Sequence, residues 1–327
     1  MGQMIDGKWH EGWYDPDAKG AFQRPKTVFR DHISSGPGGA HPAAANRYHL
    51  YVSYACPWAH RTLIMRALRG LEEAIPVTVV DPKMGDGGWE FSADDPDPIF
   101  GARHLREIYA HARKDYTGRV TVPILWDTQA RAIVNNESRE VMRMLDVEFH
   151  AFAKRAGPFD DGTYAPEHLR PQIDATLDAI YEPVNNGVYR AGFARSQEAY
   201  EHAARDVFTA LDHWEGVLGK QRYLCGDTLT EADVAMFTTL LRFDEVYYAH
   251  FKCNLRRIQD YPNLWGYLRD LYQVPEIRRT CRLDHIKTHY YWSQTTVNPT
   301  RIVPIGPTID LDAPHDRARF GNANGGA

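Results

Sequence analysis

Cysteine is scarce in this 327-residue sequence, and its four copies lie far apart at positions 56, 225, 253 and 281. No two of them have the spacing of a zinc site or of a Cys-x-x-Cys redox motif, so we expect no metal. The same scarcity excludes a small secreted scaffold held together by disulfides. We therefore expect a reducing, cytoplasmic setting.

Long apolar runs and clusters of positive charge are also absent. No stretch approaches the roughly 20 apolar residues of a membrane helix, and the N-terminus has no signal-peptide pattern. The formal net charge is −5, with no basic block, so neither nucleic acid nor an anionic membrane is an expected partner. Hydrophobic residues make up 43% of the chain, as in a globular protein, and its length predicts about two domains.

One of the four cysteines stands at the start of a predicted helix. The β-prone run Tyr48–Val52 is followed by Cys56, Pro57 and a segment of helical periodicity that ends at Leu68. Because Pro57 suits a first helical turn, Cys56 is the predicted N-cap. Free backbone N–H groups and the helix dipole favour a thiolate there. We interpret Cys56 as a nucleophile, the alternative being a buried structural thiol.

The chain divides into a mixed α/β region followed by a helical region. Residues 47–150 have the order βαβ, α, ββ, α of a thioredoxin-like domain, with a Gly- and Pro-rich insertion at 81–101. Residues 1–46 are a loop-rich extension, and 151–327 are an all-helical domain with a C-terminal extension. The predicted strands are 47–53 and 76–80, which should be parallel, and 121–126 and 132–134, which should form a hairpin. The predicted helices are 57–68, 103–114, 135–149, 166–181, 197–218, 230–248 and 262–271.

The predicted helix at 230–248 carries an explicit start signal. Thr230 and Asp233 fit a variant of the capping box, in which each side chain satisfies a backbone N–H of the other's residue. Leu229 and Val234 fit the accompanying hydrophobic staple. We interpret this signal as a device for stability.

Four segments in both regions carry a distinctive set of motifs: Tyr48–Thr62, Arg119–Asp127, Asn135–Ser138 and Asn185–Ala194. Together they resemble the glutathionyl-hydroquinone reductases, which are the xi class of the glutathione transferases. The resemblance covers nearly the whole chain. It implies the glutathione transferase fold, an α/β thioredoxin-like domain followed by an all-α domain, and it implies a homodimer.

The resemblance also implies a reaction that uses glutathione as co-substrate and no metal. A glutathionyl-hydroquinone gives its glutathione to the catalytic cysteine, matched here by Cys56, and the hydroquinone leaves. A second glutathione then releases glutathione disulfide. The residue three positions on is Ala59 and not a second cysteine, so a thiol from outside must resolve the intermediate, in agreement with this scheme.

Five residues match positions that bind glutathione in the family: Trp89, Arg119, Val122, Glu137 and Ser138. Val122 is expected to pair its main chain with the cysteinyl unit, next to a cis bond to the following proline. Glu137 and Ser138 open a helix, where N–H groups suit the γ-glutamyl carboxylate. The plainer alternatives are an edge-strand valine, a helix cap and, for Arg119, a surface charge.

Three tyrosines are candidates for contact with the quinol. The resemblance places Tyr189 and Tyr290 there, and Tyr247 is a weaker candidate whose alternative is a core position. A tyrosine O–H can donate to a developing oxyanion and pass a proton when the aryl thioether is cleaved. We interpret His60, one turn after Cys56, as a packing or surface histidine, the alternative being assistance to the thiolate. Tyr54 receives no role.

Two other functions remain as alternatives. An omega-type thiol transferase or dehydroascorbate reductase would also use a cysteine, but the insertion around Trp89 and the segment around Tyr189 argue against it. A glutathione-transferase-like binding protein without catalysis would not need Cys56, Val122 and the pair at 137–138 together. Activity with a glutathionyl-hydroquinone compared with dehydroascorbate separates the two enzymes, and labelling of Cys56 separates both from the third.

Overall fold

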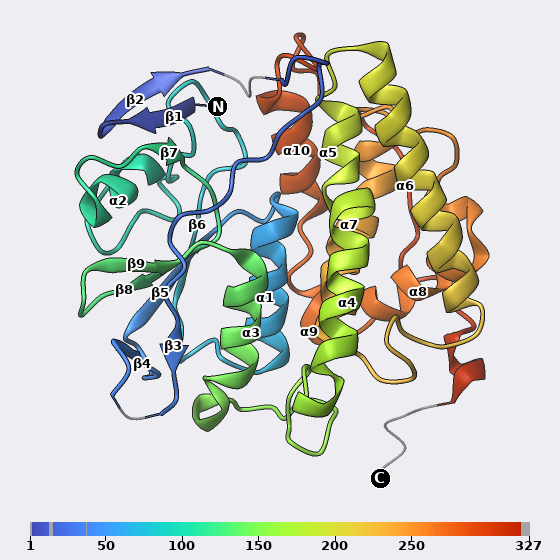
Figure 1. Cartoon of the computed structure of the whole chain (residues 1–327), viewed down its shortest axis with the longest axis horizontal. Helices are drawn as coiled ribbons and strands as arrows, with labels where there is room; N and C mark the ends of the chain where they lie inside the picture. The colour runs from blue at the N-terminus through green and yellow to red at the C-terminus, as the bar shows by residue number, and fades with distance from the viewer. Residues whose placement is uncertain (1, 13–15, 37, 322–327) are drawn as a thin grey trace. The chain divides into compact units, whose positions relative to one another are not determined.

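The computed structural model in Figure 1 describes residues 2–12, 16–36 and 38–321 and groups the chain into two compact units. The first unit contains Arg24–Arg155 and Arg282–Thr295 together with the N-terminal strands. The second contains Ala156–Cys281, a short N-terminal piece that ends at Gln23, and residues 296–321. The segment Arg282–Thr295 therefore belongs to the first unit, although it follows the helical region in sequence.

The centre of the first unit is a four-stranded sheet of order β6-β5-β8-β9. β5 (Tyr48–Val52) pairs in parallel with β6 (Val77–Val79) and antiparallel with β8 (Ile124–Asp127), which forms a hairpin with β9 (Ala132–Asn135). The predicted parallel pair and hairpin are thus confirmed. The prediction that the third strand starts at 121 is wrong, because β8 begins only after Pro123, which has no N–H to give to a ladder.

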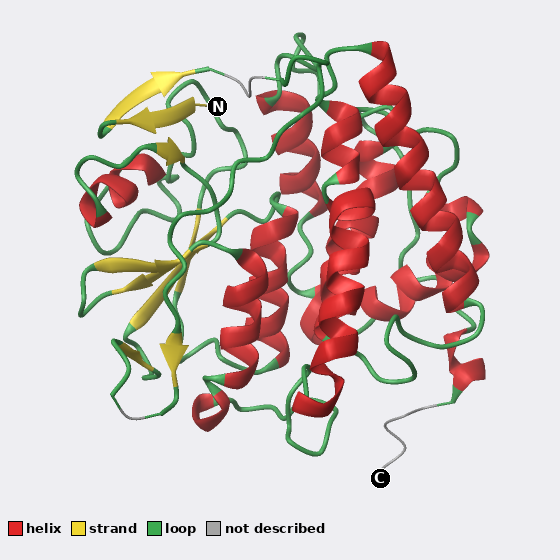
Figure 2. Ribbon diagram, in the orientation of Figure 1, coloured by secondary structure: helices red, strands yellow, loops and turns green. Residues whose placement is uncertain are grey.

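Helices α1 (Pro57–Leu68) and α3 (Ser138–Val147) pack together beside this sheet, as Figure 2 shows. The bounds of α1 agree with the prediction, and α2 (Leu105–Ala112) is shorter than predicted. A short 3-10 turn, η1 (His150–Phe152), follows α3. A further helix, α10 (Leu283–Ser293), was not predicted, because its sequence is dominated by His, Tyr and polar residues and not by a periodic aliphatic stripe.

The N-terminal extension contains strands that the sequence analysis did not predict. β1 (Gly2–Ile5) and β2 (Lys8–Glu11) form a hairpin, and β1 also pairs with β7 (Gly118–Arg119). The hairpin turns at Asp6 and Gly7, both with positive φ (47° and 73°), which is the geometry of a two-residue type I′ turn. The remaining pair, β3 (Ile33–Ser34) and β4 (His41–Pro42), is parallel.

The second unit is helical. Its long helix α6 (Gln197–Leu218) has the predicted bounds, whereas the predicted helices 166–181 and 230–248 each end in a π-helical turn. The other elements are η2 (Glu167–Leu169), α4 (Arg170–Ile180), η3 (Tyr181–Asn185), α5 (Gly187–Gly192), α7 (Glu231–Arg242), η4 (Phe243–Tyr247), η5 (Ile258–Asp260), α8 (Pro262–Tyr272), α9 (Pro275–Arg278) and η6 (Arg317–Phe320). No helix in the described part of the chain is long and apolar enough to cross a membrane.

The start of α7 confirms the predicted capping box. The carboxylate of Asp233 accepts hydrogen bonds from the N–H and the hydroxyl of Thr230, at 2.8 and 3.0 Å. It also accepts from the N–H of Leu224 and from the hydroxyl of Tyr267, both at 2.8 Å. Asp233 is fully buried, so this carboxylate links the start of α7 to two other parts of the second unit.

Candidate active site

Cys56 lies at the N-terminus of α1, as predicted. Its backbone is extended (φ −77°, ψ 120°), Pro57 occupies the first turn, and the cysteine side chain makes no capping hydrogen bond. The half-buried Sγ lies 3.6 Å from the carbonyl oxygen of Val122, and the Val122–Pro123 bond is cis, as expected. The fold thus brings the predicted nucleophile next to the backbone segment that was predicted to meet glutathione.

The other three cysteines differ from Cys56 in their surroundings. Burial raises the pKa of Cys253 and of Cys281 to about 12, and burial also raises the pKa of Cys225. Their thiols therefore stay protonated at neutral pH and are poor nucleophiles. All four cysteines are free thiols, and Cys56 is the one that occupies a helix N-cap in the described part of the chain.

Glu137 and Ser138 begin α3 within the same unit. The Glu137 carboxylate caps the helix by accepting from the N–H of Arg139 (3.4 Å) and accepts from the hydroxyl of Thr27 (3.3 Å). Ser138 is 3% exposed, and its Oγ has no hydrogen-bond partner among the described residues. An unpartnered buried hydroxyl is costly, so this atom has the capacity for one further hydrogen bond.

Trp89 and Arg119 also belong to the first unit. Trp89, in the insertion, is 7% exposed, and its ring stacks on that of His289 with centroids 4.5 Å apart. Arg119, in β7, is half-buried and donates from Nη1 to the carbonyl of Gly2 at 3.3 Å. Arg119 is thus fixed to β1 through both its strand pairing and its side chain.

Helix α10 contributes further side chains to the first unit. Tyr290 is 1% exposed, and its ring stands edge-on to that of His289, with centroids 5.5 Å apart. Tyr54, two residues before the nucleophile, stands edge-on to His285 at 5.5 Å and lies under the guanidinium of Arg282 at 5.7 Å. Burial lowers the pKa of His285, which favours a neutral imidazole.

His285 and His289 were not among the site residues predicted from the sequence. The structure adds them, because their rings contact Tyr54 and Trp89. The signal was present in the dense run of histidine and aromatic residues from 285 to 292. His60, in contrast, is fully buried in α1, so it is a packing residue. Among the described residues, no group of three or more His, Cys, Asp or Glu side chains is placed to hold a metal ion.

Tyr189 and Tyr247 are residues of the second unit. Tyr189, in α5, is 8% exposed, and its ring lies 6.0 Å from that of Tyr247. Tyr247 is fully buried in η4 and stacks on Phe251 at 5.4 Å, with an interplanar angle of 11°. Tyr247 therefore has the surroundings of a core aromatic residue.

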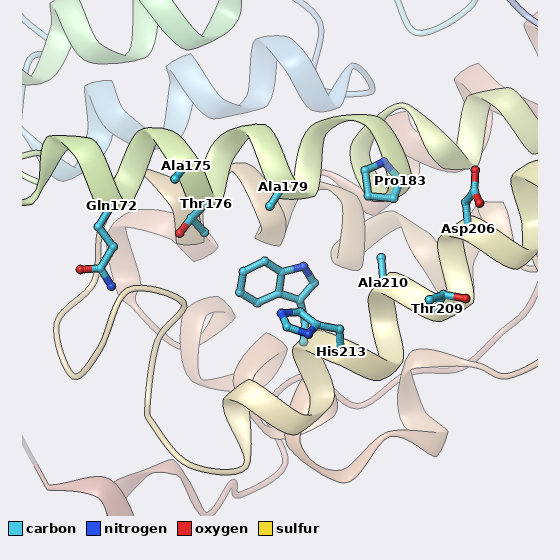
Figure 3. Close-up of a pocket in the computed structure, with 10 residues that line it drawn as sticks. Gln172, Ala175, Thr176, Ala179, Pro183, Asp206, Thr209, Ala210 and His213 are labelled. Atoms are coloured by element: carbon cyan, nitrogen blue, oxygen red, sulfur yellow. The ribbon is translucent and has the colours of Figure 1, made fainter.

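The second unit also has a hollow of about 630 Å³ between α4 and α6, shown in Figure 3. Small and apolar side chains from both helices face it. Its lining residues are Gln172, Ala175, Thr176, Ala179, Pro183, Asp206, Thr209, Ala210, His213 and Trp214. None of the site residues predicted from the sequence is among them, so this hollow is not the predicted site.

Two family models match the chain. The model for the glutathione S-transferase N-terminal domain matches residues 55–148, and the model for the glutathione S-transferase C-terminal domain matches residues 197–270. The first match spans Cys56, Val122, Glu137 and Ser138. The second spans the capping box of α7.

Individual relatives match over nearly the full length. The chain is 51% identical to glutathionyl-hydroquinone reductase YqjG of Escherichia coli, over 98% of this chain and 100% of that protein. The structure of a xi-class glutathione transferase from Natrialba magadii has 49% identity and a TM-score of 0.92, over 98% of both chains. The glutathione-bound structure of YqjG has 48% identity and a TM-score of 0.87, over 97% of this chain and 99% of that one. The chain therefore belongs to the glutathione transferase family, in the xi class of glutathionyl-hydroquinone reductases.

Proposed function

We propose that this chain reduces glutathionyl-hydroquinones to hydroquinones, with glutathione as reductant and a mixed disulfide on Cys56 as intermediate. The observation that carries the proposal is the position of the Cys56 Sγ at the N-terminus of α1, 3.6 Å from the carbonyl oxygen of Val122. A helix N-terminus favours the thiolate, which is the attacking form. The near full-length relative YqjG bears the name of this activity, which supports the assignment.

Glutathione would bind along the backbone around Cys56. The main chain of Val122 pairs with its cysteinyl unit, so that the glutathione sulfur faces Sγ. The γ-glutamyl carboxylate meets the start of α3, where the Ser138 hydroxyl has no partner among the described residues, and the Glu137 carboxylate meets the ammonium. Trp89 and Arg119 hold the remainder of the molecule.

In the first step the Cys56 thiolate attacks the sulfur of the glutathionyl-hydroquinone. A sulfur–sulfur bond forms, the aryl carbon–sulfur bond breaks, and the electron pair goes to the ring carbon, which takes up a proton. The departure is easier when the ring has shifted to its ketone tautomer, because the charge then develops on oxygen. The product is the hydroquinone, and Cys56 carries glutathione.

In the second step the thiolate of a second glutathione attacks the mixed disulfide. Glutathione disulfide forms, the Cys56 thiolate leaves, and the proton released by this glutathione balances the one taken up by the ring. The sum is one glutathionyl-hydroquinone and one glutathione converted into hydroquinone and glutathione disulfide. Since the intermediate is resolved from outside, Ala59 in place of a second cysteine is consistent with the scheme.

We assign the hydroxyl groups of Tyr189 and Tyr290 to contact with the quinol. A phenol donates to the developing oxyanion and passes a proton, and each role is worth roughly 100-fold or more in rate in other enzymes. Tyr247 is fully buried against Tyr189, so we assign it to the support of that ring and not to direct contact with substrate.

The proposal is tested by activity and by intact mass. Wild-type protein should release hydroquinone from a glutathionyl-hydroquinone, and the variant Cys56→Ser should have no reductase activity while it keeps its fold. With the glutathionyl-hydroquinone and limiting glutathione, wild type should carry one glutathione on Cys56. An adduct found only on Cys225, Cys253 or Cys281 would overturn the mechanism.

The alternatives give different results in the same assays. Faster turnover of dehydroascorbate than of the glutathionyl-hydroquinone would favour the omega-type enzyme. Strong conjugation of glutathione to an aryl halide, with no reductase activity, would contradict the mechanism altogether. Glutathione binding without any turnover would favour a binding protein.

A cytoplasmic location and a homodimer complete the proposal. The reaction consumes reduced glutathione, and all four cysteines are free, so a reducing compartment suits the protein. The homodimer is what membership of the xi class implies. Sedimentation equilibrium should give twice the mass of the chain, and the mass of a single chain would exclude the dimer.

A further inference from the structure

His289 of α10 packs flat against Trp89, the insertion residue that we assign to glutathione. The two rings are nearly parallel, with an interplanar angle of 20° and centroids 4.5 Å apart. Both side chains are buried, with 5% of His289 and 7% of Trp89 exposed. A buried stack of this kind restricts the plane that the indole can adopt.

His289 is itself held in place by the insertion. Its Nδ1 lies 3.0 Å from the carbonyl oxygen of Pro82, and because a carbonyl only accepts, Nδ1 carries the proton. One turn later on the same face of α10, the Ser293 hydroxyl donates to the same carbonyl (3.3 Å) and accepts from the N–H of Met84 (2.9 Å). Helix α10 thus binds the chain at 82–84 through two side chains.

The insertion has the form of a narrow loop whose two arms lie side by side. The N–H of Asp81 donates to the carbonyl of Glu90 at 2.8 Å, and an antiparallel bridge joins Gly85 to Gly88. Pro82–Met84 lies on the outgoing arm and Trp89 on the returning arm. Helix α10 therefore contacts both arms, the first through hydrogen bonds and the second through the stack.

We propose that His289 is a positioning residue for glutathione binding, acting through Trp89 by holding the indole in the orientation in which it meets glutathione. The inference rests on the assignment of Trp89 to glutathione in the proposed function. The neighbouring Tyr290 ring lies 5.5 Å from that of His289, so one turn of α10 orients both the glutathione-binding indole and a proposed quinol-binding phenol.

Two substitutions separate the stack from the hydrogen bond. His289→Phe keeps a flat ring against Trp89 but cannot donate to Pro82, whereas His289→Asn keeps an N–H donor near the place of Nδ1 but has no ring. Calorimetric titration of the full chain with glutathione measures the affinity of each variant. We expect His289→Asn to weaken glutathione binding roughly 3- to 10-fold, which is the scale of a lost aromatic pair. The affinity of His289→Phe should stay within about 2-fold of wild type. Circular dichroism and thermal melting confirm that each variant folds.

A double-mutant cycle tests whether His289 acts through Trp89. His289→Asn should weaken glutathione binding in the wild-type background and have less than about a 2-fold effect in the Trp89→Ala background. An equal effect in both backgrounds, or equal losses in the Phe and Asn variants, would overturn the proposal. So would a Trp89→Ala variant with wild-type affinity.

The reductase assay on wild type keeps this outcome distinct from failure of the proposed function. Wild type that turns over a glutathionyl-hydroquinone while the cycle fails leaves the function standing and removes the role of His289. A coupled cycle in a protein without reductase activity supports the positioning role and overturns the function.

Discussion

Removal of the Ser138 hydroxyl should affect the stability of the protein and its affinity for glutathione in opposite directions. Because it is buried without a partner among the described residues, Ser138→Ala should leave the free energy of unfolding of the glutathione-free protein unchanged or raise it by up to about 1 kcal/mol. The same variant should bind glutathione about 0.5–1.5 kcal/mol more weakly, since it loses a hydrogen bond. Thermal melts with and without glutathione measure both effects.

Ser293→Ala is the matched control, because this serine is as well buried but has partners at Pro82 and Met84. It should lower the melting temperature of the glutathione-free protein. If Ser138→Ala lowers that temperature as much as Ser293→Ala does, the Ser138 hydroxyl has a partner within the protein, and its assignment to glutathione loses its support.

His49 in β5 gives the protein a pH-dependent stability. Burial lowers the pKa of this histidine from 6.5 to about 4, and its Nε2 lies 2.8 Å from the Thr78 hydroxyl. Below pH 6.5 the unfolded chain binds a proton that the folded chain does not, so the free energy of unfolding should fall as the pH drops from 6.5 to about 4. The loss attributable to His49 is roughly 3 kcal/mol.

Urea unfolding at a series of pH values across this window measures the effect. His49→Gln should flatten the decline, because glutamine does not titrate. His10→Gln, at an exposed position, is the control and should keep the wild-type slope. A decline as steep in His49→Gln as in wild type would mean that other groups cause it.

At the scale of elements, the start of α7 depends on one carboxylate. Asp233→Ala should leave the N–H groups of Thr230 and Leu224 and the hydroxyl of Tyr267 without their acceptor. At about 1 kcal/mol for each lost bond, we expect a loss of roughly 3 kcal/mol or more in the free energy of unfolding.

Asp260 offers a control for this prediction. It lies in the short helix η5 and accepts from the N–H of Arg257 at 2.9 Å, but it is exposed. Asp260→Ala should therefore cost no more than about 1 kcal/mol by the same denaturant unfolding. Equal losses for the two variants would show that burial of the Asp233 network adds nothing.

Elements with strong local signals were predictable from the sequence, and those set by distant partners were not. Helix α1 was predicted with its bounds because Pro57 marks its start and the helical periodicity ends at Leu68. The β1–β2 hairpin was missed although Asp6-Gly7 is a recognised turn signal, because the flanking strands are short. The pairing of α10 with the insertion has no local signal at all, since more than a hundred residues separate them.

The residues of the candidate site also fall into those that the sequence could predict and those that depend on tertiary packing. The nucleophile and its helix follow from the order of Cys56 and Pro57, and the glutathione and quinol residues were assigned by resemblance to the family. The stack of His289 on Trp89 depends on the packing of α10 against the insertion, which neither periodicity nor spacing records. Burial of Tyr247 is likewise a tertiary property, and the sequence left a core position and a contact with the quinol as alternatives for this residue.

At the scale of the whole molecule, the first unit is assembled from separated parts of the chain. Because Arg282–Thr295 groups with Arg24–Arg155, α10 should open together with the sheet of the first unit in native-state hydrogen exchange. Its amides should therefore merge with those of β5 and β8 as denaturant is raised. Exchange of α10 in step with α6 and α8 would contradict this grouping.

The late position of α10 also has a consequence during protein synthesis. The ribosome makes the sheet and the loop around Trp89 first, then all the helices of Ala156–Cys281, and only afterwards α10. Throughout that interval the nascent first unit has no His289 ring to cover the indole and no donor from α10 for the Pro82 carbonyl. A chain stalled before Arg282 would therefore leave the Trp89 ring without its stacking partner, and the proposed glutathione site would be completed only after α10 has emerged.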